Sequence, residues 1–230
     1  MSIEQQLNLK FPIYWNDSAV EEKYLIYLIY KIIVNRPINI VELGSGISSL
    51  VIIKTLEKLG YSYNFFSVDS DALFLEETKK MLISEGVYDE KKVKLIFSPI
   101  TDITIDGNIY KWYRWSDFNF NFERIDLLFV DGPQGSLCKN ARYPAMHILG
   151  KYLKKGSMVL LHDAKREDET EIVESWEREN LIVSRVYKIE TERGGAELHF
   201  DKPRQNHEKA TVFLDEDNQY KSEKHNKAKN

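Results

Sequence analysis

The residues of this chain best suited to contact a ligand are an acid and two glycines, Glu42, Gly44 and Gly46, at the end of an apolar run. A buried strand that turns into a helix on glycines lets a ligand approach the backbone closely, because glycine has no Cβ and tolerates unusual dihedral angles. A dinucleotide fingerprint needs a third glycine, and Ser49 occupies that place. The carboxylate would also repel a pyrophosphate. The motif therefore favours S-adenosylmethionine, which carries an ammonium and a sulfonium but no phosphate.

Further acids end later apolar runs of the chain. Asp69 ends the second run, where a carboxylate can accept hydrogen bonds from both hydroxyls of a ribose. Asp131 ends the fourth run, and His162 and Asp163 end the fifth. If these last three side chains converge, they can bind a divalent cation such as Mg²⁺ or Mn²⁺, which prefers oxygen ligands. His162 can equally be the base that deprotonates an acceptor hydroxyl, with Asp131 and Asp163 as the other candidates.

Two arginines, Arg142 and Arg166, follow the fourth and fifth runs. A guanidinium can bind an anionic acceptor through two hydrogen bonds, but the interpretation we favour is a surface salt bridge at each position. An aromatic cluster of Trp112, Tyr113 and Trp115 precedes the fourth run. It can stack on a sugar or ring, or pack on the core as a lid, and the sequence leaves both roles open.

Apolar runs rich in β-branched residues alternate along the chain with segments of helical periodicity. This alternation predicts an α/β fold with right-handed crossovers: a doubly wound, mostly parallel seven-stranded sheet with helices on both faces, of Rossmann-like type. Such sheets bind ligands beyond the carboxyl ends of their strands, where all the motifs above lie. The expected strands are residues 38–43, 63–68, 92–97, 125–130, 157–161, 181–189 and 196–200.

Capping residues mark the helices between these strands. Ser18 and Glu21 form a capping-box pattern before an apolar stretch. Gly60 closes the helix that follows the first strand, and Ser70 or Asp71 caps the helix that follows the second. We therefore expect one helix before the first strand and one after each of the first two strands.

Composition narrows the possible functions. The chain has 230 residues, of which 43% are hydrophobic, which suits a single α/β domain. The net charge of −4 gives no bulk attraction to nucleic acid or to an anionic membrane. Cys138 is the single cysteine, which excludes an internal disulfide and a CxxC-type zinc site. With no visible signal peptide or spanning stretch, we expect a cytoplasmic protein, and its oligomeric state stays open.

The chain divides by composition into three parts. We expect residues 1–36 to form an N-terminal segment and helix packed on the domain, and residues 37–200 to form the ligand-binding domain. Residues 201–230 are a polar extension, in which residues 210–214 can add an edge strand. The composition from about residue 217 predicts disorder.

Several segments resemble the class I S-adenosylmethionine-dependent methyltransferases. Residues 41–46 (VELGSG) are similar to the first motif of that superfamily, and residues 67–69 (SVD) to the second. Residues 130–135 (VDGPQG), 141–145 (ARYPA) and 161–166 (LHDAKR) resemble a poorly characterised bacterial branch. On this resemblance the ligand-binding domain is a methyltransferase domain.

The resemblance implies roles for particular residues. It places Glu42, Gly44, Ser45 and Gly46 around the methionine moiety of the cofactor, Asp69 on its ribose, Ser98 near its adenine and Asp131 near its sulfonium. Metal-dependent catechol-type O-methyltransferases carry acids at the ends of the fourth and fifth strands, as Asp131 and Asp163 do here. Their third ligand is an asparagine, where this chain has Ala164, so metal dependence stays open.

The function implied by the resemblance is methyl transfer from S-adenosylmethionine, and we expect O-methylation of a small-molecule or glycan-type acceptor. A similar sheet also suits a nicotinamide-dependent oxidoreductase, although Glu42 and the serine at position 49 disfavour that function. A catalytically inactive relative that acts as a binding subunit is the other alternative. The intact acids at the strand ends disfavour it.

Overall fold

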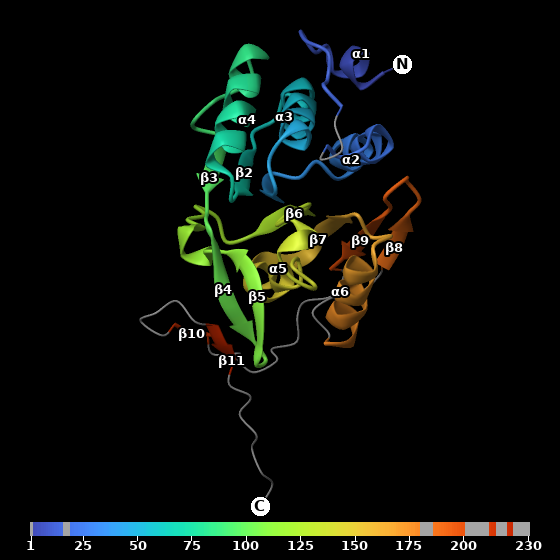
Figure 1. The fold of residues 1–230 in the computed structure, drawn as a ribbon. Helices are drawn as coiled ribbons and strands as arrows, with labels where there is room; N and C mark the ends of the chain where they lie inside the picture. Colours follow the sequence, from blue (N-terminus) through green and yellow to red (C-terminus); the bar gives the residue numbers. More distant parts are fainter. Residues whose placement is uncertain (1, 16–18, 180–185, 201–211, 215–219, 223–230) are drawn as a thin grey trace, which may run out of the picture.

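The computed structural model describes residues 2–15, 19–179, 186–200, 212–214 and 220–222 (Figure 1). The central sheet consists of β1 (Asn39–Leu43), β2 (Asn64–Asp69), β3 (Val93–Phe97), β6 (Ile125–Val130), β7 (Leu153–His162), β8 (Val186–Ile189) and β9 (Gly195–His199). Its seven strands are ordered β3-β2-β1-β6-β7-β9-β8. Strand β9 pairs antiparallel with both of its neighbours, and the other pairs are parallel. The predicted mostly parallel, doubly wound sheet is confirmed.

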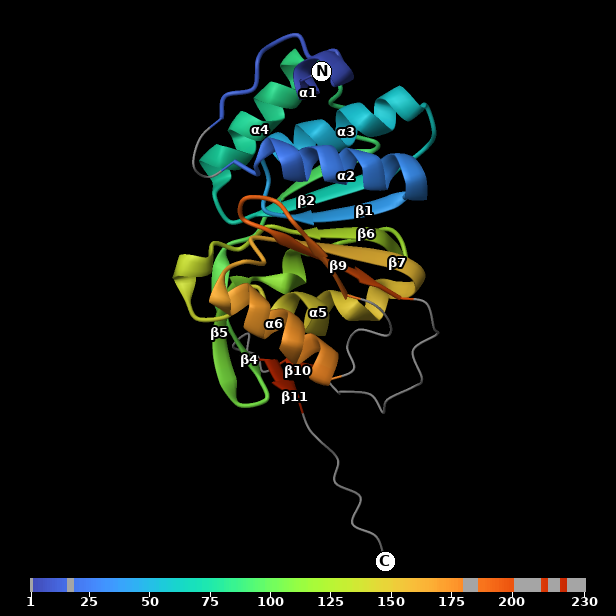
Figure 2. The same ribbon diagram turned by 90° about the vertical axis from the view of Figure 1, so that its right-hand side faces the viewer.

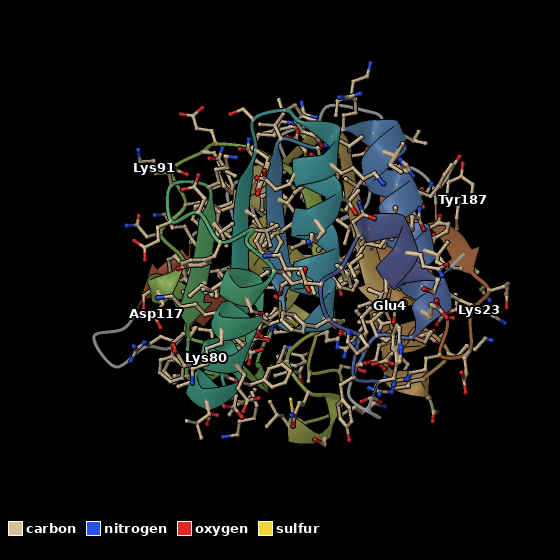
Figure 3. All side chains as sticks on the ribbon, turned by 90° about the horizontal axis from the view of Figure 1, so that it is seen from above. Glu4, Lys23, Lys80, Lys91, Asp117 and Tyr187 are labelled. Atoms are coloured by element: carbon tan, nitrogen blue, oxygen red, sulfur yellow. The ribbon has the colours of Figure 1, made fainter. Side chains whose placement is uncertain are left out.

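Helices cover both faces of this sheet (Figure 2). One face carries α1 (Ile3–Leu7), α2 (Glu22–Asn35), α3 (Ile47–Leu59) and α4 (Ala72–Ser84), and the other carries α5 (Pro144–Leu149) and α6 (Glu167–Arg178). From above, α3 lies between α4 and α2 (Figure 3). The crossovers bring the glycine-rich turn, which joins β1 to α3, to the same edge of the sheet as the turns that follow β6 and β7.

Side chains of each strand alternate between two hydrophobic cores. In β1, Ile40 belongs to the core beneath α2 and α3, whereas Val41 and Leu43 belong to the core on the α5 and α6 face. Because both faces are covered, the central strands are continuous apolar runs in the sequence. The same alternation places Glu42 on the face of Ile40, toward α3.

A β-hairpin that the sequence did not predict stands beside the sheet. It consists of β4 (Ile100–Ile105) and β5 (Asn108–Tyr113), joined by an Asp-Gly turn at residues 106–107 in which both φ angles are positive, 48° and 83°. Such a dipeptide is a strong hairpin signal. At the end of β5, Trp112 and Tyr113 are buried in the core. Of the two roles left open for these aromatic residues, packing on the core is the one observed.

The predicted capping box at the start of α2 is wrong. The N-cap of this helix is Glu21, and its side chain makes no capping hydrogen bond. Its carboxylate instead accepts hydrogen bonds from the hydroxyl of Thr191 and the backbone N–H of Arg193 and contacts His162. The other residue of the predicted box, Ser18, lies outside the described residues. By contrast, Asp71 caps α4 and Gly60 ends α3, as predicted.

The C-terminal extension contributes no strand to the central sheet within the described residues. Strands β10 (Val212–Leu214) and β11 (Tyr220–Ser222) pair antiparallel with each other, so the expected edge strand at residues 210–214 has a different partner. Most of the stretch predicted to be disordered, and residues 181–185 of the sixth expected strand, lie outside the described residues. None of the described helices is long and apolar enough to cross a membrane.

Candidate functional site

A cavity of about 730 Å³ opens at the carboxyl ends of β1, β2, β6 and β7. That volume suits a cofactor-sized ligand, and the position is the one where doubly wound sheets bind ligands. The residues that matter for its chemistry are Gly44, Ser45, Asp69, Phe74, Tyr113, Asp131, Gly132, Arg142, Asp163, Arg166, Glu169 and Arg193. The topology therefore brings most of the predicted site residues together.

The glycine-rich turn after β1 has the conformation that its sequence predicts. Gly44 and Gly46 have φ angles of +90° and +134°, which side-chain-bearing residues rarely adopt. A Cβ on Gly44 would lie 3.2 Å from backbone atoms of Asp131 and Gly132. The turn thus lies directly against the segment that follows β6, and only glycine fits there without strain.

Asp69 fixes this turn from the end of β2. Its Oδ2 atom accepts hydrogen bonds from the backbone N–H of Ser45 at 2.7 Å and from the Ser45 hydroxyl at 2.9 Å, and its Oδ1 atom accepts one from the backbone of Asp71 at 3.0 Å. Each carboxylate oxygen can accept more than one hydrogen bond. Asp69 lines the cavity, so the carboxylate that orders the turn is also available to a ligand.

Glu42 lies beneath the turn and does not line the cavity. It is fully buried, and its Oε2 atom accepts hydrogen bonds from the hydroxyls of Ser49 and Ser67. Ser49 in turn accepts a hydrogen bond from the backbone of Gly46 at 3.1 Å. Burial raises the pKa of Glu42 to about 7, against the hydrogen bonds that lower it. Glu42 thus supports the turn from the α3 side through Oε2, while its Oε1 atom accepts no hydrogen bond among the described residues, and its expected place near the methionine moiety stays a prediction.

Ser98, which we expect near the adenine of the cofactor, is buried beside the hairpin, and the expectation stays a prediction. It follows β3, as predicted, and its hydroxyl donates a hydrogen bond to the carbonyl of Arg114 at 3.0 Å. It is not among the residues that line the cavity. The missed hairpin explains this placement, because its return to the core supplies the acceptor for this hydroxyl.

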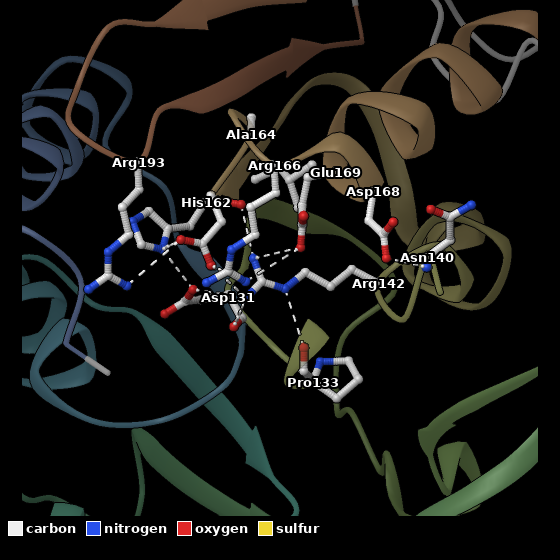
Figure 4. Close-up of polar contacts among 12 residues, drawn as sticks. Asp131, Pro133, Asn140, Arg142, His162, Ala164, Arg166, Asp168, Glu169 and Arg193 are labelled. Atoms are coloured by element: carbon white, nitrogen blue, oxygen red, sulfur yellow. Dashed lines mark hydrogen bonds and ion pairs between the residues drawn. The ribbon is translucent and has the colours of Figure 1, made fainter. Parts of the chain in front are cut away.

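His162 is enclosed between the carboxylates of Asp131 and Glu21, and Figure 4 shows it beside Asp131. Its Nδ1 atom lies 2.8 Å from Oδ1 of Asp131, and its Nε2 atom lies 2.5 Å from Oε2 of Glu21. Burial lowers the pKa of His162, but the carboxylates of Asp131, Glu21 and Asp163 outweigh it and raise the pKa to about 9. An imidazolium with both nitrogens engaged cannot accept a proton near neutral pH. The geometry therefore does not support the predicted role of His162 as the base.

Arg142 is neither a surface residue nor a free anion-binding group. Its side chain is buried and donates hydrogen bonds to the backbone carbonyls of Asp131 at 2.7 Å, His162 at 2.9 Å and Pro133 at 3.3 Å. Its Nη2 atom also lies 3.1 Å from Oδ2 of Asp163. Our expectation of a surface salt bridge is wrong, because α5 and the end of the sheet enclose the guanidinium.

The remaining charges surround Asp163, a buried residue with a positive φ of 63°. Arg166, half-exposed, approaches its Oδ2 atom to 3.0 Å, and Arg193 approaches its Oδ1 atom to 3.8 Å. Glu169 is buried at 3.7 Å from Arg142, and burial raises its pKa. The cluster as a whole balances four carboxylates against four cations. The carboxylates are Glu21, Asp131, Asp163 and Glu169, and the cations are Arg142, His162, Arg166 and Arg193.

The predicted metal-ligand group does converge. Ligand atoms of Asp131, His162 and Asp163 lie within 4.8 Å of one another. However, both His162 nitrogens face carboxylates, and both acids face arginine. As arranged, the donor set does not fit a divalent cation, because both ring nitrogens are engaged and the arginines already supply positive charge to the two acids.

Sequence reasoning missed two residues that shape the site, Glu21 and Phe74, and left the role of a third, Tyr113, open. Glu21 was assigned to a helix cap, although it reaches the imidazole of His162. Tyr113 comes from the unpredicted hairpin, and its hydroxyl packs directly against Gly132, where a Cβ would clash with it. Phe74, on α4, gave no signal, because an aromatic residue on a helix face usually marks the core.

A second, smaller cavity of about 220 Å³ adjoins the first. Ser45, Phe74 and Asp131 line both. The rest of its wall comes from the N-terminal segment, α3 and α4, and includes Tyr14, Val20, Ile47, Thr78 and Met81. Asp131 therefore stands where the two cavities meet.

No protein-family model and no curated protein matches this chain. Several solved structures are similar to it. The S-adenosylhomocysteine-bound methyltransferase PaMTH1 of Podospora anserina aligns with a TM-score of 0.60 and 13% identity, covering 87% of this chain and 86% of that chain. The O-methyltransferase TomG of Streptomyces achromogenes, which is involved in tomaymycin synthesis, aligns with a TM-score of 0.58 and 14% identity over the same shares. The chain has the fold of these methyltransferases. An O-methyltransferase from Bacillus cereus is also similar, with a TM-score of 0.57, 11% identity and coverage of 86% and 88%.

The glycine turn lies close to the end of β6, so alanine at Gly44 should lower the free energy of unfolding more than alanine at a glycine with open space around it. Gly44→Ala should cost the strain of a positive φ, about 1–2 kcal/mol, and the 3.2 Å backbone contact in addition. Gly107→Ala is the matched control, since its φ is +83° and a Cβ there meets nothing within 4 Å. Urea unfolding of both variants measures the difference. Equal losses would contradict the packing described for the turn.

The raised pKa of His162 predicts a stability that falls in alkaline solution. Because the folded pKa of about 9 lies above the unfolded value of 6.5, the imidazolium stabilises the protein fully below pH 6.5 and loses this effect as pH rises through 9. The loss is on the order of 3 kcal/mol, at ~1.4 kcal/mol per pKa unit. The groups that face the ring are Glu21, Asp131, Asp163 and Tyr24.

Urea unfolding between neutral and alkaline pH measures this loss. A His162→Gln variant, whose side chain does not titrate, should be less stable than the parent at neutral pH and should show a flatter profile. A parent profile as flat as that of the variant would contradict the assigned imidazolium.

Proposed function

We propose that the protein is an S-adenosylmethionine-dependent methyltransferase that methylates an oxygen atom of a small-molecule or glycan-type acceptor. One observation carries the proposal: a glycine turn pinned by Asp69 opens onto the same cavity as Asp131 at the switch point of the sheet. The similarity of the fold to O-methyltransferases supports it.

The half of the cavity near β1 and β2 suits the cofactor. Gly44 and Ser45 would bind its methionine moiety, and Asp69 would accept hydrogen bonds from its ribose hydroxyls. Phe74 offers an aromatic surface beside the turn, since a Cβ on Gly46 would lie 3.2 Å from its ring. Bound there, the cofactor would supply an activated methyl group.

The other half of the cavity suits a polar acceptor. Its wall includes Gln134, Ser136, Arg166, Glu167 and Asp168, which offer hydrogen-bond donors and acceptors and little apolar surface. A polyhydroxylated or charged molecule fits such a wall better than a flat apolar one. This supports a small polar or glycan-type acceptor.

The contribution of the chain to methyl transfer would be alignment of the acceptor and exclusion of water. A hydroxyl acceptor must also lose a proton. Asp131 is the residue we assign to accept it, because it lies where the two cavities meet and all its side-chain contacts among the described residues involve Oδ1. His162 and Arg142 hold that oxygen, which leaves Oδ2 for the acceptor. Asp163, held by arginines, would keep this arrangement in place.

Three finer assignments belong to the same proposal. The sequence segments at 130–135, 141–145 and 161–166 support membership of the bacterial branch that they resemble. The net charge of −4 supports a small-molecule partner over nucleic acid, and a cytoplasmic location is the one we propose.

Calorimetric titration with S-adenosylhomocysteine tests the cofactor, with NAD as the control ligand. We expect binding of S-adenosylhomocysteine and none of NAD. Binding of NAD alone would favour an oxidoreductase, and binding of neither would favour an inactive relative. Either result would overturn the proposal.

The Asp69→Ala variant tests the site itself. Loss of a charged acceptor should weaken S-adenosylhomocysteine binding by about 1.5–3 kcal/mol, roughly tenfold or more. Asp126→Ala is the matched control, since Asp126 accepts backbone hydrogen bonds from Ile38 and Asn39 at the opposite end of the sheet. Equal affinities of Asp69→Ala and the parent would show that the ligand binds elsewhere.

A further inference from the structure

The guanidinium of Arg142 lies between the two acids that a metal-dependent enzyme of this fold would use as ligands. Its Nη2 atom is 3.1 Å from Oδ2 of Asp163 and 3.4 Å from Oδ1 of Asp131. Figure 4 shows Arg142 beside Asp131. One nitrogen atom thus faces both carboxylates. A divalent cation held by both acids would have to compete with this guanidinium.

Arg142 is fixed in this position by its other hydrogen bonds. Three backbone carbonyls accept from it, those of Asp131, Pro133 and His162, and these residues follow or end two neighbouring strands. The side chain is only 3% exposed. A buried guanidinium that gave up these partners would leave charge and carbonyl groups unpaired, so displacement by an ion is unfavourable.

The neighbouring imidazole offers no replacement ligand, and the buried carboxylate oxygens that accept no hydrogen bond among the described residues, Asp163 Oδ1 and Glu169 Oε2, belong to acids that lie against arginines. Both ring nitrogens of His162 face carboxylate oxygens, at 2.8 Å and 2.5 Å, so neither presents a lone pair to a metal. Ala164 stands where the metal-dependent pattern has an asparagine. Arg166 adds a second positive charge 3.0 Å from Asp163, and a cation entering this cluster would be repelled.

We propose that Arg142 is a built-in cation at the ends of β6 and β7, and that this protein neither binds nor needs a divalent metal ion there. The guanidinium neutralises Asp131 and Asp163 as a metal would, but it is held by the backbone and leaves no open coordination position. The part of the proposal that concerns the reaction rests on the proposed function.

The absence of a chelating ion also bears on the acceptor. A metal held by two strand-end acids selects acceptors that present two adjacent oxygen atoms to it. With Arg142 in that place, the side chains of the cavity wall select the acceptor, and an acceptor needs only one hydroxyl group to be methylated. We therefore expect acceptors without adjacent hydroxyl groups to be used as readily as those with them.

Titration of the parent protein with Mn²⁺, followed by electron paramagnetic resonance of the free ion and by calorimetry, tests the proposal directly. We expect no binding tighter than about 1 mM, the weak limit of dedicated cation modules. Affinity for S-adenosylhomocysteine should be the same with EDTA as with Mg²⁺. Saturable micromolar binding of one Mn²⁺ per chain, lost in Asp163→Asn, would overturn the proposal.

Two variants test whether Arg142 is the reason. Arg142→Ala should bind Mn²⁺ at least tenfold more tightly than the parent, since Asp131, Asp163 and Glu169 then lack this cation. Arg142→Lys, which keeps the charge, should gain nothing. A folded Arg142→Ala chain, verified by circular dichroism, with no gain would refute the assignment. If that chain does not fold, the parent titration decides.

These measurements separate the metal proposal from the proposed function. The Mn²⁺ titrations contain neither cofactor nor acceptor, so their outcome does not depend on methyl transfer. Loss of S-adenosylhomocysteine binding would remove the methyltransferase assignment and leave the built-in cation standing. Tight Mn²⁺ binding would remove the built-in cation and leave the cofactor assignment standing.

Discussion

The hydrogen bonds of the buried guanidinium of Arg142 are the interaction on which the rest of the site depends. They join the carbonyl groups of Asp131 and Pro133, after β6, to that of His162, at the end of β7. A buried charge is tolerated only when its partners are complete, so the two strand ends cannot shift independently. The orientation of Asp131, and with it the junction of the two cavities, follows from this constraint.

The charge balance of the cluster extends the site beyond the sheet. His162 is an imidazolium that holds Asp131 on one side and Glu21, the first residue before α2, on the other. Glu21 also accepts hydrogen bonds from Thr191 and from the backbone of Arg193, next to β9. The start of α2, the loop between β8 and β9 and the acids at the ends of β6 and β7 therefore form one electrostatic unit. A substitution in any of them should therefore alter the electrostatic environment of Asp131.

The sequence predicted the sheet and the convergence of its strand ends well, because apolar runs, glycines and terminal acids are local patterns. It could not predict that the side chain of Glu42 is buried toward α3, because the direction of a side chain depends on which helix covers each side of the sheet. Glu21 was misassigned for a related reason: the pattern of a helix cap is local, whereas its partner His162 is distant in sequence. The Asp-Gly turn at residues 106–107 was a readable hairpin signal. The burial of Arg142 could not have been predicted, since it follows from tertiary packing alone.

A crystal structure of the protein with S-adenosylhomocysteine tests the central claim, that one cavity at the strand ends holds the cofactor on one side of Asp131 and the acceptor on the other. The account predicts both ribose hydroxyls within about 3.2 Å of the Asp69 carboxylate, the sulfur atom beside Asp131, and Arg142 unmoved between the two acids. A ligand bound in another part of the molecule, or a metal ion between Asp131 and Asp163 with Arg142 displaced, would contradict it.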